Sequence, residues 1–152
     1  MNASDAQNID FSKLLATVKE RQLNEQELAL LNANHVEFDK FIDLHFTDFG
    51  PERITATVEA DPRHHQPAGQ VNGGVFCSIG ESMGSYAGFV AAGVPVVGMN
   101  NNTDLIRPVT SGTIEAEATA IHVGRRTQIW RIEMQQDGKI VAITTLRTMV
   151  MG

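Results

Sequence analysis

Apolar residues recur at helical spacing in the first part of the chain. Asp10 can cap a first helix, and Asn24 begins a second stretch, NEQELALLNANH, in which Gln26 and Glu27 stand as in a capping box. The pattern predicts two amphipathic, peripheral helices. The apolar positions of the first are Phe11, Leu14, Leu15 and Val18.

From Phe41 the pattern changes to strict alternation, which is typical of strands. IDLHFTDF and RITATVEA, joined by a turn at Asp48–Pro51, predict a hairpin, and a polar loop follows at 61–72. After a long helical stretch come four more strands with tight turns, including an Asp137-Gly138 hairpin signal. Consecutive hairpins imply an antiparallel sheet that covers the helix, an α+β fold. The four later strands are expected at 95–106, 113–124, 127–136 and 139–151.

The stretch between the two groups of strands, residues 70–93, predicts a long helix rich in small residues. Gly80, Gly84 and Gly88 recur at every fourth position, and each glycine costs about 1 kcal/mol relative to alanine in a helix interior. Three glycines on one ridge therefore indicate very close packing against a sheet or another helix.

Glu81 is the only charged residue of this helix and shares one face with Cys77 and Ser85. A carboxylate among small apolar residues is costly unless it is paired, and burial would make it a usable base or nucleophile. The structural alternative is an exposed glutamate on a solvated face.

The helix begins with Gly73 and Gly74, where backbone amides are unpaired and the helix dipole is positive. Such a start can stabilise a carbonyl oxygen that gains negative charge, although a glycine pair can also serve only the sharp turn. Eight residues separate Gly73 from Glu81, roughly 12 Å at 1.5 Å per residue. One chain cannot easily bring both to one carbonyl, whereas two antiparallel copies about a twofold axis can.

Length and charge narrow the function classes. The 152 residues suit one domain with its own core, and a formal charge of −6 argues against general nucleic-acid binding. The single cysteine, Cys77, excludes an intramolecular disulfide. No apolar run reaches the roughly 18 residues that span a bilayer, and the first residues lack the pattern of a signal peptide. We therefore expect a cytoplasmic protein without membrane or nucleic-acid partners.

Residues 40–151 resemble the hotdog-fold acyl-CoA thioesterases, in the group of 4-hydroxybenzoyl-CoA, phenylacetate-pathway and 1,4-dihydroxy-2-naphthoyl-CoA thioesterases. In that family a loop Gln or Asn stands seven positions before the oxyanion glycine, and the catalytic carboxylate eight positions after it. Gln66, Gly73 and Glu81 match these positions, and Ser85 matches the Ser or Thr one turn further on. The resemblance implies a hotdog domain over 39–152 and an N-terminal helical extension over 1–38.

One difference from the family is Asn72, where His often precedes the glycine pair of Gly73 and Gly74. Asn72 can donate or accept a hydrogen bond but does not titrate, so the substrate or the rate is expected to differ. Further along, IHVGRRTQIWRIE resembles the strand and turn that meet the nucleotide end of coenzyme A. Arginine suits phosphate through its planar fork, and solvated hairpin charges are the alternative. The matching positions are His122, Gly124, Arg125 and Arg126.

The resemblance implies hydrolysis of an acyl-CoA thioester with an aromatic or medium-chain acyl group. The Gly73 amide would polarise the carbonyl and Gln66 would place the carbonyl or the water. Glu81 of the neighbouring subunit would act as nucleophile or general base, and Ser85 would orient the carboxylate or the acyl group. Asn72 and Gly74 would contact substrate.

We expect no metal or redox cofactor, coenzyme A being part of the substrate. The resemblance also implies a homodimer with shared active sites, assembled as a dimer of dimers into a homotetramer. A hotdog-fold hydratase or dehydratase is one alternative. That chemistry uses a His paired with Asp or Glu, and the presence of Asn72 in place of the His weakens it. A non-catalytic acyl-CoA-binding protein is another.

Overall fold

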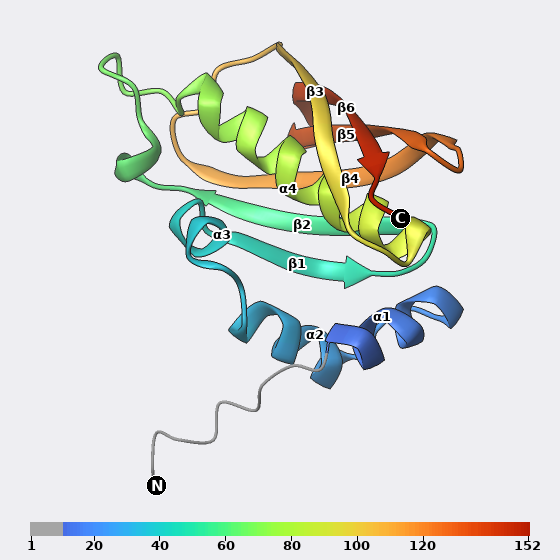
Figure 1. Cartoon of the computed structure of the whole chain (residues 1–152). Helices are drawn as coiled ribbons and strands as arrows, with labels where there is room; N and C mark the ends of the chain where they lie inside the picture. The colour runs from blue at the N-terminus through green and yellow to red at the C-terminus, as the bar shows by residue number, and fades with distance from the viewer. Residues whose placement is uncertain (1–10) are drawn as a thin grey trace, which may run out of the picture.

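The computed structural model describes residues 11–152 as three short helices, a six-stranded sheet and one long helix (Figure 1). The helices are α1 (Phe11–Glu20), α2 (Glu25–Ala33), α3 (Glu37–Phe41) and α4 (Gly73–Ala92), and a 3-10 turn, η1, covers Pro62–His64. The strands are β1 (Leu44–Phe49), β2 (Arg53–Ala60), β3 (Val96–Leu105), β4 (Gly112–Val123), β5 (Thr127–Gln136) and β6 (Lys139–Val150).

The sheet is antiparallel throughout, in the order β1-β2-β4-β5-β6-β3. Consecutive strands form hairpins at β1–β2, β4–β5 and β5–β6. The prediction of a hairpin between β3 and β4 was wrong, because β3 pairs with β6 while β4 pairs with β2 and β5. A tight turn reports only on its own backbone, so the 106–111 segment does not reveal which strand becomes the neighbour. As a result β3 lies at one edge of the sheet.

The sheet curves around α4, which lies against its inner face (Figure 1). Ile79 and Met83 of α4 are fully buried there. The glycine ridge makes the close contact that its spacing predicted. A Cβ at Gly80 would lie 2.6 Å from the Cβ and Cγ2 of Thr144 on β6, and one at Gly84 would lie 2.5 Å from Leu146 Cδ2. The prediction of very close packing is confirmed, and it is the sheet that α4 approaches.

The ends of α4 follow from local sequence. Asn72 is the N-cap, with its Oδ1 accepting a hydrogen bond from the Gly74 N–H at 2.8 Å. Gly93 ends the helix in the left-handed region, φ 73°, which glycine adopts without strain. The predicted long helix is therefore confirmed, and the structure adds Gly93 as its C-cap.

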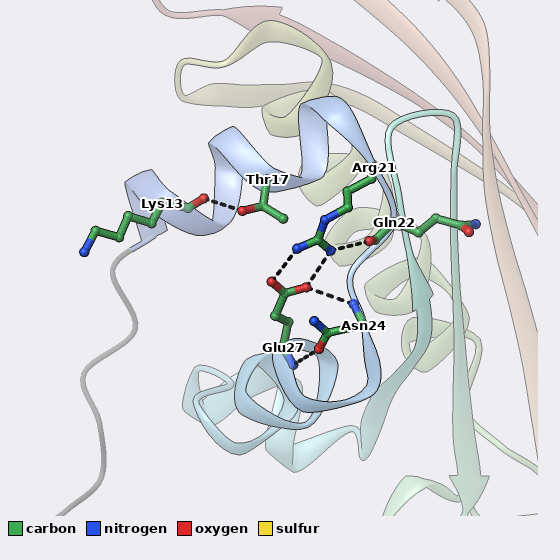
Figure 2. A network of polar contacts seen from close by, with 6 residues as sticks. All are labelled: Lys13, Thr17, Arg21, Gln22, Asn24 and Glu27. Carbon is green, nitrogen blue, oxygen red and sulfur yellow. Dashed lines mark hydrogen bonds and ion pairs between the residues drawn. The ribbon is translucent and has the colours of Figure 1, made fainter.

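Figure 2 shows how α1 and α2 are joined. The predicted capping box is present, because the side chain of Asn24 accepts from the Glu27 N–H and Glu27 accepts from the Asn24 N–H. Both carboxylate oxygens of Glu27 also accept from the guanidinium of Arg21 at 2.8 Å, and these bonds lower the pKa of Glu27 to about 2. The predicted cap at Asp10 lies outside the described residues.

A short helix, α3, which was not predicted from the sequence, precedes the first strand. The alternation predicted that this strand begins at Ile42, but β1 begins only at Leu44. Asp43 between them has φ 59°, so the chain turns sharply out of α3 and into the sheet. This turn places α3 beside α4, where the candidate site is built.

Candidate functional site

Glu81 lies in the middle of α4 and its side chain is half-buried. The Asn101 side chain, on β3, donates from Nδ2 to Glu81 Oε2 at 3.0 Å and to the carbonyl of Cys77 at 3.0 Å. Gly98 of β3 lies against the other carboxylate oxygen, with room for no Cβ. The carboxylate is therefore held in one orientation between the helix and the edge strand.

Asn101 is itself held by the sheet. Thr103 donates from Oγ1 to Asn101 Oδ1 at 2.8 Å, and its hydroxyl lies 2.7 Å from that of the fully buried Thr144. The amide group is therefore oriented with its Nδ2 toward Glu81. This supporting chain of contacts was not predicted from the sequence, because it joins α4, β3 and β6, and Thr103 and Thr144 alone are 41 residues apart.

A pocket of about 400 Å³ opens beside Glu81. Ser85, one turn further along α4, lines the same pocket, as the shared helix face predicted. Opposite them stand Val36 and Phe38, both more than half exposed, at the start of α3. The pocket therefore combines two carboxylates, Glu81 and Asp39, and a few hydroxyl groups with largely apolar walls, an arrangement typical of small-molecule sites.

A second carboxylate, Asp39 of α3, is buried at the wall of this pocket with 2% exposure. Ser82 donates to Asp39 Oδ1 at 2.7 Å and Tyr86 donates to Oδ2 at 3.2 Å. Burial raises the pKa of Asp39, but the hydrogen bonds and the nearby His35 outweigh it, so the pKa lies below its ordinary value. Asp39 therefore stays ionised and attaches α3 to α4.

The same contacts act on Tyr86 in the opposite direction. Burial and the negative charge of Asp39 raise the pKa of the Tyr86 hydroxyl, so the phenol stays protonated and donates. His35 completes the cluster with its Nδ1 3.8 Å from Asp39 Oδ2. Sequence reasoning missed this cluster. Its members come from α3, α4 and the segment before α3, and the signal that could have drawn attention is an acidic residue within the EFDKF segment.

The start of α4 presents a different site. The Gly74 N–H is occupied by the Asn72 side chain, whereas within residues 11–152 the Gly73 N–H has no hydrogen-bond acceptor. Gly73 lines a separate pocket of about 240 Å³ with Leu105 and Arg107 among its walls. Gly73 and Glu81 thus face different pockets within one chain.

The remaining predicted residues lie elsewhere on the chain. Gln66 belongs to the loop after η1, where its Oε1 accepts from the Ala68 N–H. His122 stands exposed near the end of β4, and Gly124 lies so close to it that a Cβ would be 2.7 Å from His122 Nε2. Arg125 and Arg126 project from the exposed turn between β4 and β5. None of these groups lines the pocket that holds Glu81 in the described part of one chain.

The described residues show neither a cluster of metal-ligating side chains nor a membrane-spanning helix. Across residues 11–152, no three His, Cys, Asp or Glu side chains come close enough together to hold a metal ion. Among the helices of the same residues, none is long and apolar enough to cross a bilayer.

Comparison with known proteins is consistent with this geometry. A family model described as the thioesterase superfamily matches residues 68–143. The 1,4-dihydroxy-2-naphthoyl-CoA hydrolase of Escherichia coli is 31% identical over 114 residues, which cover 73% of this chain and 84% of that protein. The proofreading thioesterase EntH of Cronobacter turicensis is 32% identical over 129 residues, 82% of this chain and 94% of its own length.

Solved structures share the fold. A thioesterase from Haemophilus influenzae superposes with a TM-score of 0.77 at 33% identity, and the match covers 82% of this chain and 90% of that one. The six-stranded antiparallel sheet around a long helix is the hotdog fold, as expected, here preceded by short helices.

Proposed function

This chain belongs to the thioesterase superfamily, and we propose that it hydrolyses an acyl-CoA thioester to the free acid and coenzyme A. The observation that carries the proposal is the placement of Glu81. It is the one carboxylate of α4, it is aimed by Asn101, and it lines an open pocket with apolar walls and the hydroxyl of Ser85. A carboxylate in this setting can activate water or attack a carbonyl carbon.

The reaction consumes one water for each thioester. In the general-base route Glu81 takes a proton from water, whose oxygen adds to the carbonyl carbon, and the C–S bond then breaks as the thiol of coenzyme A leaves with a proton. In the nucleophilic route a Glu81 oxygen bonds to the carbonyl carbon first, and the C–S bond breaks as coenzyme A leaves as the thiolate. Water then cleaves the resulting anhydride, which gives the free acid, restores the Glu81 carboxylate and supplies the proton of the thiol. In both routes the carbonyl oxygen gains negative charge, which the Gly73 N–H at the positive end of α4 would stabilise.

The proposal requires two chains for each site. Gly73 and Glu81 face different pockets of one chain, so we propose a homodimer in which the Gly73 amide of one subunit serves the Glu81 of the other. β3 supports this arrangement, because it is an edge strand with exposed apolar side chains at Val97, Met99 and Leu105. Exposed apolar edges of this kind favour pairing with another chain. A dimer of dimers would then give the tetramer.

The substrate class is proposed on chemical grounds. The pocket walls at Val36 and Phe38 suit an aromatic or medium-chain acyl group. Arg125 and Arg126 are exposed, and their planar guanidinium groups suit the phosphates of coenzyme A. The name of the E. coli relative specifies an aromatic acyl-CoA for that protein. Acyl-CoA is a cytoplasmic substrate class, which agrees with a chain that has one cysteine, and we propose the cytoplasm as its location.

The proposal is tested by following thiol release from benzoyl-, octanoyl- and acetyl-CoA with a chromogenic thiol reagent. Glu81→Gln keeps the size of the side chain and removes the base or nucleophile, so turnover should fall by at least ~100-fold. Glu115→Gln is the matched control, because Glu115 is an exposed glutamate on β4 outside this pocket.

Near-normal turnover by Glu81→Gln would refute the role of Glu81. The two alternative functions give distinct results in the same preparation. Hydration of crotonyl-CoA without thiol release would indicate a hydratase, and binding of acyl-CoA without either reaction would indicate a binding protein.

A further inference from the structure

An apolar cavity of about 80 Å³ lies between α1, α2 and α4, next to the pocket that holds Glu81. Its walls include Leu14, Leu15 and Val18 of α1 and Leu31 of α2. Among the described residues that line it, the one polar side-chain group is the Tyr86 hydroxyl, which donates to Asp39. The lining side chains therefore offer a ligand no unpaired polar group, and cavities of this kind accept apolar ligands.

Two residues of α4, Tyr86 and Phe89, line both this cavity and the Glu81 pocket. Tyr86 is held in place by its hydrogen bond to Asp39 and by edge-on contacts with Phe46 and Phe49, at centroid distances of 5.0 and 6.0 Å. Phe89 has a purely hydrocarbon side chain and is partly exposed. Of the two, Phe89 is therefore the one that can turn, so the route between pocket and cavity passes it.

The distance from Glu81 to Phe89 determines how long an acyl chain must be to reach the cavity. Glu81, Ser85 and Phe89 follow one another at four-residue intervals, so Phe89 stands eight residues beyond Glu81, roughly 12 Å along the helix. A fully extended chain advances about 1.2 Å per bond, judging from 3.3–3.6 Å for the three bonds of one residue. An acyl chain whose carbonyl is at Glu81 thus needs about ten carbons to reach Phe89.

We propose that this cavity receives the distal end of an unbranched alkyl acyl group of about ten or more carbons, with α1 forming the far wall. The inference rests on the proposed function, because it places the thioester carbonyl at Glu81. It assigns the N-terminal helices a part in substrate selection. Side chains of α1 determine how long an acyl chain the site accepts.

The test compares dodecanoyl-CoA with butanoyl-CoA in the full chain. Leu15→Phe adds bulk at the far wall of the cavity, and Ala16→Phe adds the same aromatic ring on the exposed face of α1. Each methylene that is excluded from an apolar site reduces kcat/KM about fourfold. Leu15→Phe should therefore lower the dodecanoyl-to-butanoyl ratio of kcat/KM at least ~10-fold, and Ala16→Phe should leave the ratio as in the wild type.

Phe89→Ala provides a second variant that does not depend on filling the cavity. Removing the ring joins the pocket to the cavity, so the ratio should rise. Thermal unfolding of each variant identifies any that fail to fold. If the ratio is unchanged in both Leu15→Phe and Phe89→Ala while thiol is still released, the inference is overturned and the thioesterase function stands.

A binding measurement distinguishes a failure of the tail-cavity proposal from a failure of the proposed thioesterase function. S-dodecyl-CoA and S-butyl-CoA are thioethers, which have no thioester carbonyl for the enzyme to hydrolyse, and calorimetry gives their affinities. Tighter binding of S-dodecyl-CoA that Leu15→Phe removes supports the cavity as a tail site even if no acyl-CoA is hydrolysed. Equal affinities of the two thioethers, or a dodecyl preference that Leu15→Phe leaves intact, count against it.

Discussion

Replacing Gly80 with alanine tests the close contact between α4 and β6. The new Cβ would lie 2.6 Å from both Cβ and Cγ2 of Thr144. Thr144 cannot retreat, because it is fully buried, β-branched and held by Thr103 at 2.7 Å. Overpacking against a fixed side chain costs up to ~3 kcal/mol, while alanine returns about 1 kcal/mol of helix propensity.

We therefore expect Gly80→Ala to lower the free energy of unfolding by about 2 kcal/mol, or about 4–8 °C in Tm for a chain of this size. Urea denaturation at a fixed protomer concentration measures the change, since dimerisation would otherwise shift the midpoint. Gly84→Ala should cost less, because its Cβ meets the flexible end of Leu146 at 2.5 Å. Gly74→Ala is the milder control, because among the described residues its Cβ would meet only Asn72 Oδ1, at 3.1 Å, where a small shift is enough.

A double-mutant cycle identifies the partner. Gly80→Ala combined with Thr144→Ala should be at least ~0.5 kcal/mol more stable than the two single changes added together, because the smaller side chain leaves room for the new Cβ. If Gly80→Ala is as stable as the wild type, or if it costs no more than Gly84→Ala, the reasoning from the contact is refuted.

Three further predictions concern the site. Gly73→Pro should lower kcat ~100-fold relative to Gly73→Ala, because proline fits the first helical position but has no N–H. Both variants add a Cβ against Leu105, so the comparison isolates the N–H. Equal rates of thiol release by the two variants would contradict this. The Arg125→Ala/Arg126→Ala variant should raise KM for octanoyl-CoA and not for the N-acetylcysteamine thioester in steady-state assays, and an equal rise for both would exclude a phosphate contact. Asp39 has a folded-state pKa below its ordinary 3.8, so its ionised form stabilises the fold above pH 3.8, and this contribution disappears as the pH falls through the folded-state pKa. In urea unfolding, Asp39→Asn should be less stable than the wild type near neutral pH, and its free energy of unfolding should fall less as the pH is lowered. If the free energies of unfolding of the two proteins fall in parallel with pH, the reasoning is disproved.

Local features of the fold were predictable because they depend on a few neighbouring residues. The Asn24–Glu27 capping box joins residues three apart, and Gly93 ends α4 through its own φ of 73°. The Asp137-Gly138 hairpin follows from two positive φ values, 50° and 70°, in adjacent residues. In each case the backbone conformation is specified within one turn of chain.

Features that join distant segments were not predictable in the same way. α3 is only five residues long, and its role becomes visible when Asp39 meets Ser82 and Tyr86, which are 43 and 47 residues away in the chain. The pairing of β3 with β6 likewise depends on where α4 returns the chain to the sheet, which turn geometry does not report. The spacing of side chains along the sequence contains neither piece of information.

The sequence by itself determined that α4 is a close-packed helix with one carboxylate, since glycine spacing and the single Glu81 are properties of a regular helix. It also determined that Gly73 and Glu81 stand too far apart for one site, because the rise per residue is constant. Only the tertiary structure decided that Asn101 aims Glu81, that α3 forms the opposite wall, and that an apolar cavity lies behind Phe89. Those relations depend on which surfaces meet, and surfaces meet only when the chain has folded.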